Sequence, residues 1–102
     1  VESAQKRFAK VLSMEHDNVE ALCLMGRLHF EAGRLTEALD CFAKIRLNDS
    51  EKVSGRKLRL VLEAFEDDGI ALEKLKRPAE AVSSYEKLLI VAKRSLAHLN
   101  EK

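Results

Sequence analysis

One residue spacing occurs three times in this 102-residue chain and constrains its fold more than any other feature. Each copy is an alanine, an aromatic residue four positions later, and an aliphatic residue three positions after that. The copies are Ala4, Phe8 and Val11; Ala38, Phe42 and Ile45; and Ala81, Tyr85 and Leu88. Positions i, i+4 and i+7 lie on one face of an α-helix. The spacing therefore predicts three helices that pack through equivalent faces.

A glycine pattern precedes the second and third copies at the same distance. The first set is Leu22, Gly26 and His29, which precede Ala38. The second set is Phe65, Gly69 and Leu72, which precede Ala81 by the same numbers of residues. A glycine inside a helix is about 1 kcal/mol less favourable than an alanine, which makes its repetition informative. We interpret each glycine as the site of a tight crossing, where a neighbouring helix occupies the space of the missing side chain.

Together these patterns resemble the tetratricopeptide repeat, whose period is about 34 residues. In residues 21–45, Leu22 stands in the usual tryptophan place, Met25-Gly26 replaces Leu-Gly, and Gly33 occupies the turn. Residues 65–89 look like a second unit, and residues 4–18 like the second helix of an earlier one. The step from Ala4 to Ala38 is 34 positions, whereas the step from Ala38 to Ala81 is 43, nine more.

Several positions depart from the family pattern. His29 stands where tyrosine is usual, Asp68 replaces the leucine before Gly69, and Lys76 replaces the turn glycine. No proline closes any of the units.

The resemblance implies an all-α fold, in which antiparallel helical hairpins stack as a right-handed α-solenoid. We expect one domain over residues 1–102, as a fragment of a larger protein. In this division, residues 1–17 are the second helix of a truncated repeat and residues 18–50 are a complete repeat. Residues 51–102 are then an extended repeat with a long terminal helix.

Five helices are expected, with long fourth and fifth members. Their approximate ranges are 2–15, 19–33, 36–47, 51–75 and 78–99. Asp17 with Glu20 three residues later has the form of a capping box, and Asp49 or Ser50 offers a cap for the fourth helix. The nine added residues either lengthen the start of the fourth helix or form a loop around Gly55, and the first option is favoured. Pro78 suits the first position of the fifth helix.

Charge and composition argue against several classes of function. The net charge is +1, from 18 basic and 17 acidic residues, which gives no reason to expect a nucleic-acid partner. No run of apolar residues is long enough for a membrane span. The cysteines, Cys23 and Cys41, and the three histidines match no metal spacing, and no glycine-rich phosphate loop is present. We therefore expect no enzyme activity, no cofactor and no metal, and an intracellular, cytoplasmic setting.

The resemblance also implies where a partner would bind, because first helices of such repeats line a concave groove. The matching positions are Glu20, Cys23, Arg27, Phe30, Glu31, Glu63, Glu66, Ile70, Glu73 and Lys74. The run Glu63, Glu66, Asp67 and Glu73 predicts a negative field that steers a basic peptide toward the groove. The alternative is a solvated helix face, neutralised by Arg56, Lys57 and Arg59 upstream.

The function that follows is a scaffold or adaptor that binds a peptide or helical segment of a protein partner. A clamp for the C-terminal carboxylate of chaperones is not expected, because Glu63 and Asp67 would repel it. The alternative function is self-assembly, as a homodimer through the exposed faces of the terminal helices. The long fifth helix fits either longer peptide-binding repeats or a cap at the end of the array.

Overall fold

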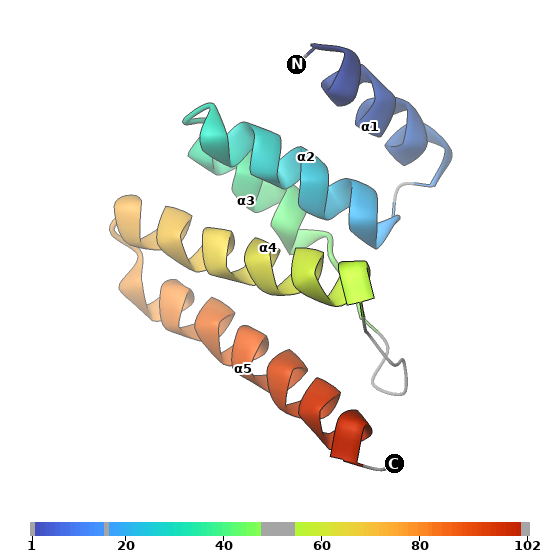
Figure 1. The fold of residues 1–102 in the computed structure, drawn as a ribbon. Coiled ribbons are helices and arrows are strands. Elements are labelled where there is room, and N and C mark those ends of the chain that lie inside the picture. Colours follow the sequence, from blue (N-terminus) through green and yellow to red (C-terminus); the bar gives the residue numbers. More distant parts are fainter. Residues whose placement is uncertain (1, 16, 48–54, 101–102) are drawn as a thin grey trace.

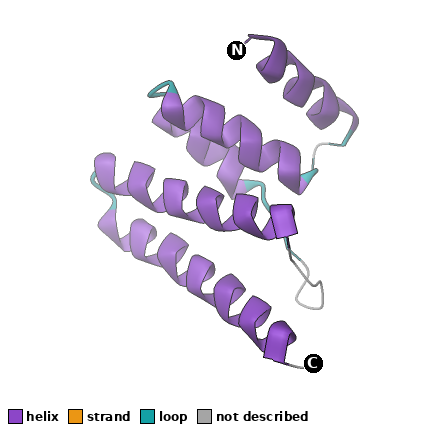
Figure 2. Cartoon of the chain, viewed as in Figure 1, coloured by secondary structure: helices purple, strands orange, loops and turns teal. Residues whose placement is uncertain are grey.

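The computed structural model describes residues 2–15, 17–47 and 55–100, and its regular structure is entirely helical (Figures 1 and 2). Within these ranges there are five helices and no strand. They are α1 (Glu2–Met14), α2 (Val19–Glu31), α3 (Leu35–Ala43), α4 (Gly55–Lys74) and α5 (Pro78–Asn100). The expected all-α class, the five helices and the long fourth and fifth members are confirmed.

The helices form two hairpins with α1 at one end. Figure 1 shows α2 paired with α3, α4 paired with α5, and α1 beside α2. Helix α4 lies at the centre, because it packs against α2, α3 and α5. The core lies between the hairpins, where Leu22, Val61 and Ala38 are almost fully buried with Phe42 and Phe65.

The two glycines stand at the tight crossings that their repetition predicts. A Cβ atom on Gly26 would lie 2.3 Å from the ring of Phe42, and one on Gly69 would lie 2.5 Å from the ring of Tyr85. Real Cβ atoms do not approach other atoms this closely, so the rings of Phe42 and Tyr85 come this near to α2 and α4 because the side chain is missing there. The sequence repeat therefore corresponds to a glycine–aromatic contact that occurs in both hairpins.

Both hairpin turns contain a residue in the left-handed region of backbone conformation. Gly33 has a φ angle of 83° and Lys76, at the equivalent position, has a φ angle of 61°. In each turn the next residue donates its amide hydrogen to the carbonyl five positions back, a bond that ends many helices: Arg34 to His29, and Arg77 to Leu72. The turn geometry is thus kept although the glycine is not.

Two predicted helix ends differ from the structure. The cap of α2 is Asn18 rather than Asp17, because the Asn18 side chain accepts the Ala21 amide at 2.9 Å. Helix α3 ends at Ala43 rather than near residue 47, where Lys44 and Ile45 donate to carbonyls only three residues back. That early end turns Ile45 into the core, where its exposed fraction is 7%.

The added residues between the units lengthen α4 as far as the structure describes them. Helix α4 starts ten positions before Phe65, whereas α2 starts three positions before the equivalent Leu22. The difference is seven residues, or about two turns. The predicted caps at Asp49 and Ser50 and the predicted start at residue 51 lie outside the described residues.

Candidate functional site

The ten predicted binding residues all lie on the neighbouring helices α2 and α4, and nine of them reach solvent at least in part. The exposed ones are Glu20, Glu31, Glu63, Glu66, Glu73 and Lys74, and the half-buried ones are Arg27, Phe30 and Ile70. We call the surface made by these nine residues the α2/α4 face.

Cys23 does not belong to this face, and its predicted place in a groove is wrong. Its exposed fraction is only 3%, because α4 packs over α2 at this point and encloses the side chain with Leu22 and Val61. Burial, reinforced by the nearby carboxylate of Glu20, raises the pKa of the Cys23 thiol to about 12. The thiol is therefore a protonated core group at neutral pH.

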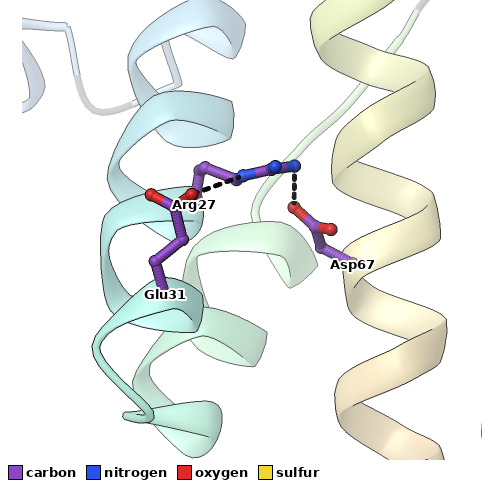
Figure 3. A network of polar contacts seen from close by, with 3 residues as sticks. All are labelled: Arg27, Glu31 and Asp67. Atoms are coloured by element: carbon purple, nitrogen blue, oxygen red, sulfur yellow. Dashed lines mark hydrogen bonds and ion pairs between the residues drawn. The ribbon is translucent and has the colours of Figure 1, made fainter.

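One ion pair joins the two helices across this surface. The Arg27 guanidinium donates to Asp67 Oδ2 at 2.9 Å and to Glu31 Oε2 at 3.4 Å (Figure 3). The Asp67 side chain is only 5% exposed, whereas that of Arg27 is 43% exposed. Burial raises the pKa of Asp67, and the positive charge of Arg27 opposes that rise. Arg27 thus compensates a carboxylate that α4 holds away from water.

Burial also corrects the predicted source of the negative field. Asp67 was expected to contribute to it, but its charge is buried and matched by Arg27. The exposed carboxylates are instead those of Glu20 and Glu31 on α2 and of Glu63, Glu66 and Glu73 on α4. Lys74 and the half-buried Lys57 oppose them in part.

Two further contacts fix side chains on or beside the face. The Lys74 ammonium lies 5.7 Å from the centre of the Phe30 ring, a cation–π contact that again joins α4 to α2. The Tyr85 hydroxyl donates to Glu73 Oε1 at 2.5 Å, and this bond raises the pKa of Tyr85 to about 12. The cation–π contact thus joins α2 to α4 at a second place, beside the ion pair of Arg27 with Asp67.

Sequence reasoning missed the role of Asp67, and nothing in the acidic run separates it from its neighbours Glu66 and Asp68. Its pairing depends on how α2 is placed beside α4, which the local pattern does not encode. It also missed a groove of about 710 Å³ between α3 and α5. None of the ten predicted residues lines that groove.

The chemistry available on the α2/α4 face is charge and apolar contact. Within residues 2–15, 17–47 and 55–100, no group of three or more His, Cys, Asp or Glu side chains is arranged to hold a metal ion. In the same part of the chain, no helix is long and apolar enough to cross a membrane.

A comparison with protein families identifies the type of chain. The family model described as tetratricopeptide repeat protein 7 N-terminal matches residues 9–90, which is most of the chain. The chain belongs to this family. The matched part runs from within α1 to within α5 and includes both hairpins, so the tetratricopeptide resemblance is confirmed. No curated protein and no solved structure matches the chain.

Membership of a tetratricopeptide family carries a general functional meaning. Repeats of this type are modules for protein–protein interaction, and the family has that character. Nine of the ten residues predicted to contact a partner lie on the α2/α4 face of this family member.

Proposed function

We propose that the chain is a scaffold or adaptor module that binds a basic segment of a partner protein on the α2/α4 face, without catalysis. In this proposal the hairpins are part of a right-handed α-solenoid, and the α2/α4 face lines its concave side. The observation that carries the proposal is the set of five exposed glutamates on two neighbouring helices, which are also joined by an ion pair.

The charge balance supports a basic partner. The face carries two cations, Lys74 and Arg27, and the charge of Arg27 is matched by the buried Asp67. What a partner meets is therefore dominated by carboxylates, and such a surface steers positively charged segments and selects against acidic ones. Phe30 and Ile70 add half-buried apolar contacts between the charges.

The test is selection from a displayed library of natural cytosolic protein segments. The wild-type chain is compared with Glu63→Lys, Glu66→Lys, which reverses two exposed charges on α4. A matched control, Glu15→Lys, Glu86→Lys, makes the same charge change at exposed positions that belong neither to the α2/α4 face nor to the groove between α3 and α5. We expect basic segments to be enriched by the wild type and the control and lost by the α4 variant. Equal enrichment by all three, or none by a monodisperse wild type, would reject the proposal.

A second candidate function, self-assembly as a homodimer, is favoured by the outer side of α5. Among the described residues, four of the five exposed large hydrophobic side chains lie on this helix. Val82, Leu89 and Leu96 follow each other at intervals of seven residues and form one stripe, more than half exposed at each position. Helix α5 already packs against α4 with another face. A helix that is apolar on two faces is typical of one that packs against other helices on both sides.

Sedimentation equilibrium over a wide range of protein concentration tests this second candidate. A dimer through the stripe predicts a mass that rises with concentration and falls to that of the monomer in Leu89→Glu. Met14→Glu makes the same change at an exposed apolar side chain on α1 and is expected to leave the dimer intact. A mass of one chain at every concentration would contradict self-assembly.

We also propose an intracellular, cytoplasmic setting. The support is the state of the cysteines: Cys23 and Cys41 are both free, one buried and one half-buried. Free thiols are the usual state in reducing compartments. Localisation of the tagged chain by microscopy checks this, and an extracellular or luminal pool would contradict it.

A further inference from the structure

A groove runs between α3 and α5 on the other side of α4 from the α2/α4 face. Its volume is about 710 Å³, within the usual range for ligand-binding clefts. Phe65, Asp68 and Leu72 of α4 line it, and helical geometry places these positions nearly opposite Glu66 and Ile70. The groove is therefore separate from the surface of the proposed function.

The interior of the groove is apolar and well supported. It is lined by Phe42, Phe65, Leu72 and Val91, which all belong to the buried core and are at most 8% exposed. Side chains fixed in this way offer a preformed surface. At the edge, Ile90 of α5 is 50% exposed, so apolar surface continues out of the groove into solvent.

Two of the acidic groups in the groove have partners. The Ser84 hydroxyl donates to Asp68 Oδ2, and Arg77 donates to Glu80 Oε1 at 2.8 Å. Asp68 also lies within electrostatic range of Lys87. The Arg77 and Lys87 cations offset part of the negative charge that a ligand would meet.

On α5, basic residues lie on either side of the apolar Ile90 at the edge of the groove. Lys87, Ile90 and Arg94 follow at intervals of three and four residues, and all three are exposed. Arg46 adds a cation at the end of the α3 wall. Intervals of three and four residues match the periodicity of a helix lying alongside, with an apolar centre and charged flanks.

We infer that this groove binds an amphipathic helix of a partner protein, with apolar residues between α3 and α5 and flanking Asp or Glu residues against Lys87 and Arg94. Insertion of an amphipathic helix into an apolar groove is a general mode of recognition. The buried apolar lining of the groove argues against a nucleic-acid backbone, which is charged along its whole length. The partner is opposite in charge to that of the α2/α4 face, so one chain would hold two partners on two sides.

The test uses synthetic helical peptides of about 18 residues, roughly five turns, labelled for fluorescence anisotropy. One peptide has a leucine face flanked by glutamates, a second has lysines in place of the glutamates, and a third is a scramble of the first without an apolar face. We expect the 102-residue chain to bind the first peptide at least about tenfold more tightly than either of the others. Binding of the lysine peptide or the scramble with equal strength would overturn the inference.

Variants locate the binding. Ser83→Trp fills the groove from an exposed position without changing charge, and Lys87→Glu, Arg94→Glu reverses its basic wall. Both are expected to weaken binding of the glutamate peptide about tenfold or more. Lys10→Glu, Lys93→Glu is the charge-matched control, because both positions are exposed and neither lines the groove. Circular dichroism confirms that each variant is folded before it is compared.

The outcomes separate this inference from the proposed function. If Ser83→Trp and the α5 double variant bind the glutamate peptide as the wild type does, the groove is not the site and the inference fails. Loss of binding in these two variants and not in the control supports it. Capture of basic segments by the α2/α4 face is measured on the same proteins and is expected to be unchanged in Ser83→Trp.

Discussion

The ring of Phe42 occupies the space in which a side chain on Gly26 would lie, with only 2.3 Å between its nearest atom and the position of a Cβ. The same relationship joins Tyr85 to Gly69 in the next hairpin. Because the Phe42 side chain is buried, it has little room to move away. The two contacts fix how closely each pair of helices approaches.

Gly26→Ala is therefore expected to destabilise the chain, although alanine is the better helix former by about 1 kcal/mol. Overpacking of a core costs about 1–3 kcal/mol, and we expect this cost to prevail. Denaturant unfolding measures the change in the free energy of unfolding. Phe42→Leu in the Gly26→Ala background should recover part of the loss, and a Gly26→Ala variant as stable as the wild type would contradict the close contact.

Lys76→Gly is expected to stabilise the chain by about 0.5–1 kcal/mol. A residue with a side chain costs about 1–2 kcal/mol in the left-handed region, while glycine loses about 0.5–1 kcal/mol through its greater freedom when unfolded. Lys44→Gly is the matched control, because Lys44 ends α3 with a φ angle of −85°. That control should destabilise the chain. Thermal unfolding in which Lys76→Gly behaves like Lys44→Gly would refute the argument from conformation.

Arg27→Ala is expected to destabilise the chain by about 1–3 kcal/mol at neutral pH, because it leaves the buried Asp67 carboxylate without its partner. Asp67→Asn in the same background should recover part of the loss, since it removes the uncompensated charge. Glu31→Ala is the control: it removes a side chain that is 60% exposed, so little change is expected. Urea unfolding of the four proteins makes the comparison.

The loss of stability caused by Arg27→Ala should also depend on pH. Burial raises the pKa of Asp67 above its ordinary value of 3.8, and removal of Arg27 raises it further. The folded state then holds this proton more tightly than the unfolded state, so stability is greatest below the ordinary value and falls as pH rises through the raised pKa. Arg27→Ala should therefore cost least in acid. A cost that does not vary between acidic and neutral pH would contradict this assignment.

Tyr85 is expected to ionise near pH 12 in the folded chain rather than near 10. It is the only tyrosine and there is no tryptophan, so ultraviolet absorbance reports its ionisation without interference. Because the folded pKa is the higher one, the stability linked to this proton is fully present below pH 10 and is lost as pH rises through 12. Glu73→Gln should move the pKa back toward 10, and an unchanged titration would show that the hydrogen bond to Glu73 is absent.

The two cysteines should react with a thiol reagent at different rates in the folded chain. Cys41 is half-buried and is expected to react first, whereas the buried Cys23, with its pKa raised to about 12, should react only after unfolding. Reaction with a chromogenic disulfide, followed in Cys23→Ser and Cys41→Ser, assigns the two phases. Equal rates for the two thiols in the folded state would contradict the burial of Cys23.

Local pattern alone was sufficient for the helical class, the hairpin pairing and the glycine crossings. The contacts of Gly26 with Phe42 and of Gly69 with Tyr85 can be predicted from the sequence. A helical glycine at a fixed distance along the chain from an aromatic residue is a local pattern. The turn at Lys76 can be predicted only by aligning it with Gly33, because lysine has no preference for the left-handed backbone conformation.

Only the tertiary structure decided which charges and thiols face a partner. Cys23 and Asp67 belong to helix positions that a repeat pattern leaves at the surface, yet both are buried where α2 lies against α4. The groove between α3 and α5 likewise exists because both helices pack on α4. Periodicity fixes which side chains share one face of a helix, whereas burial depends on where a second helix lies. That position is set by contacts between residues far apart in the chain, such as Arg27 with Asp67.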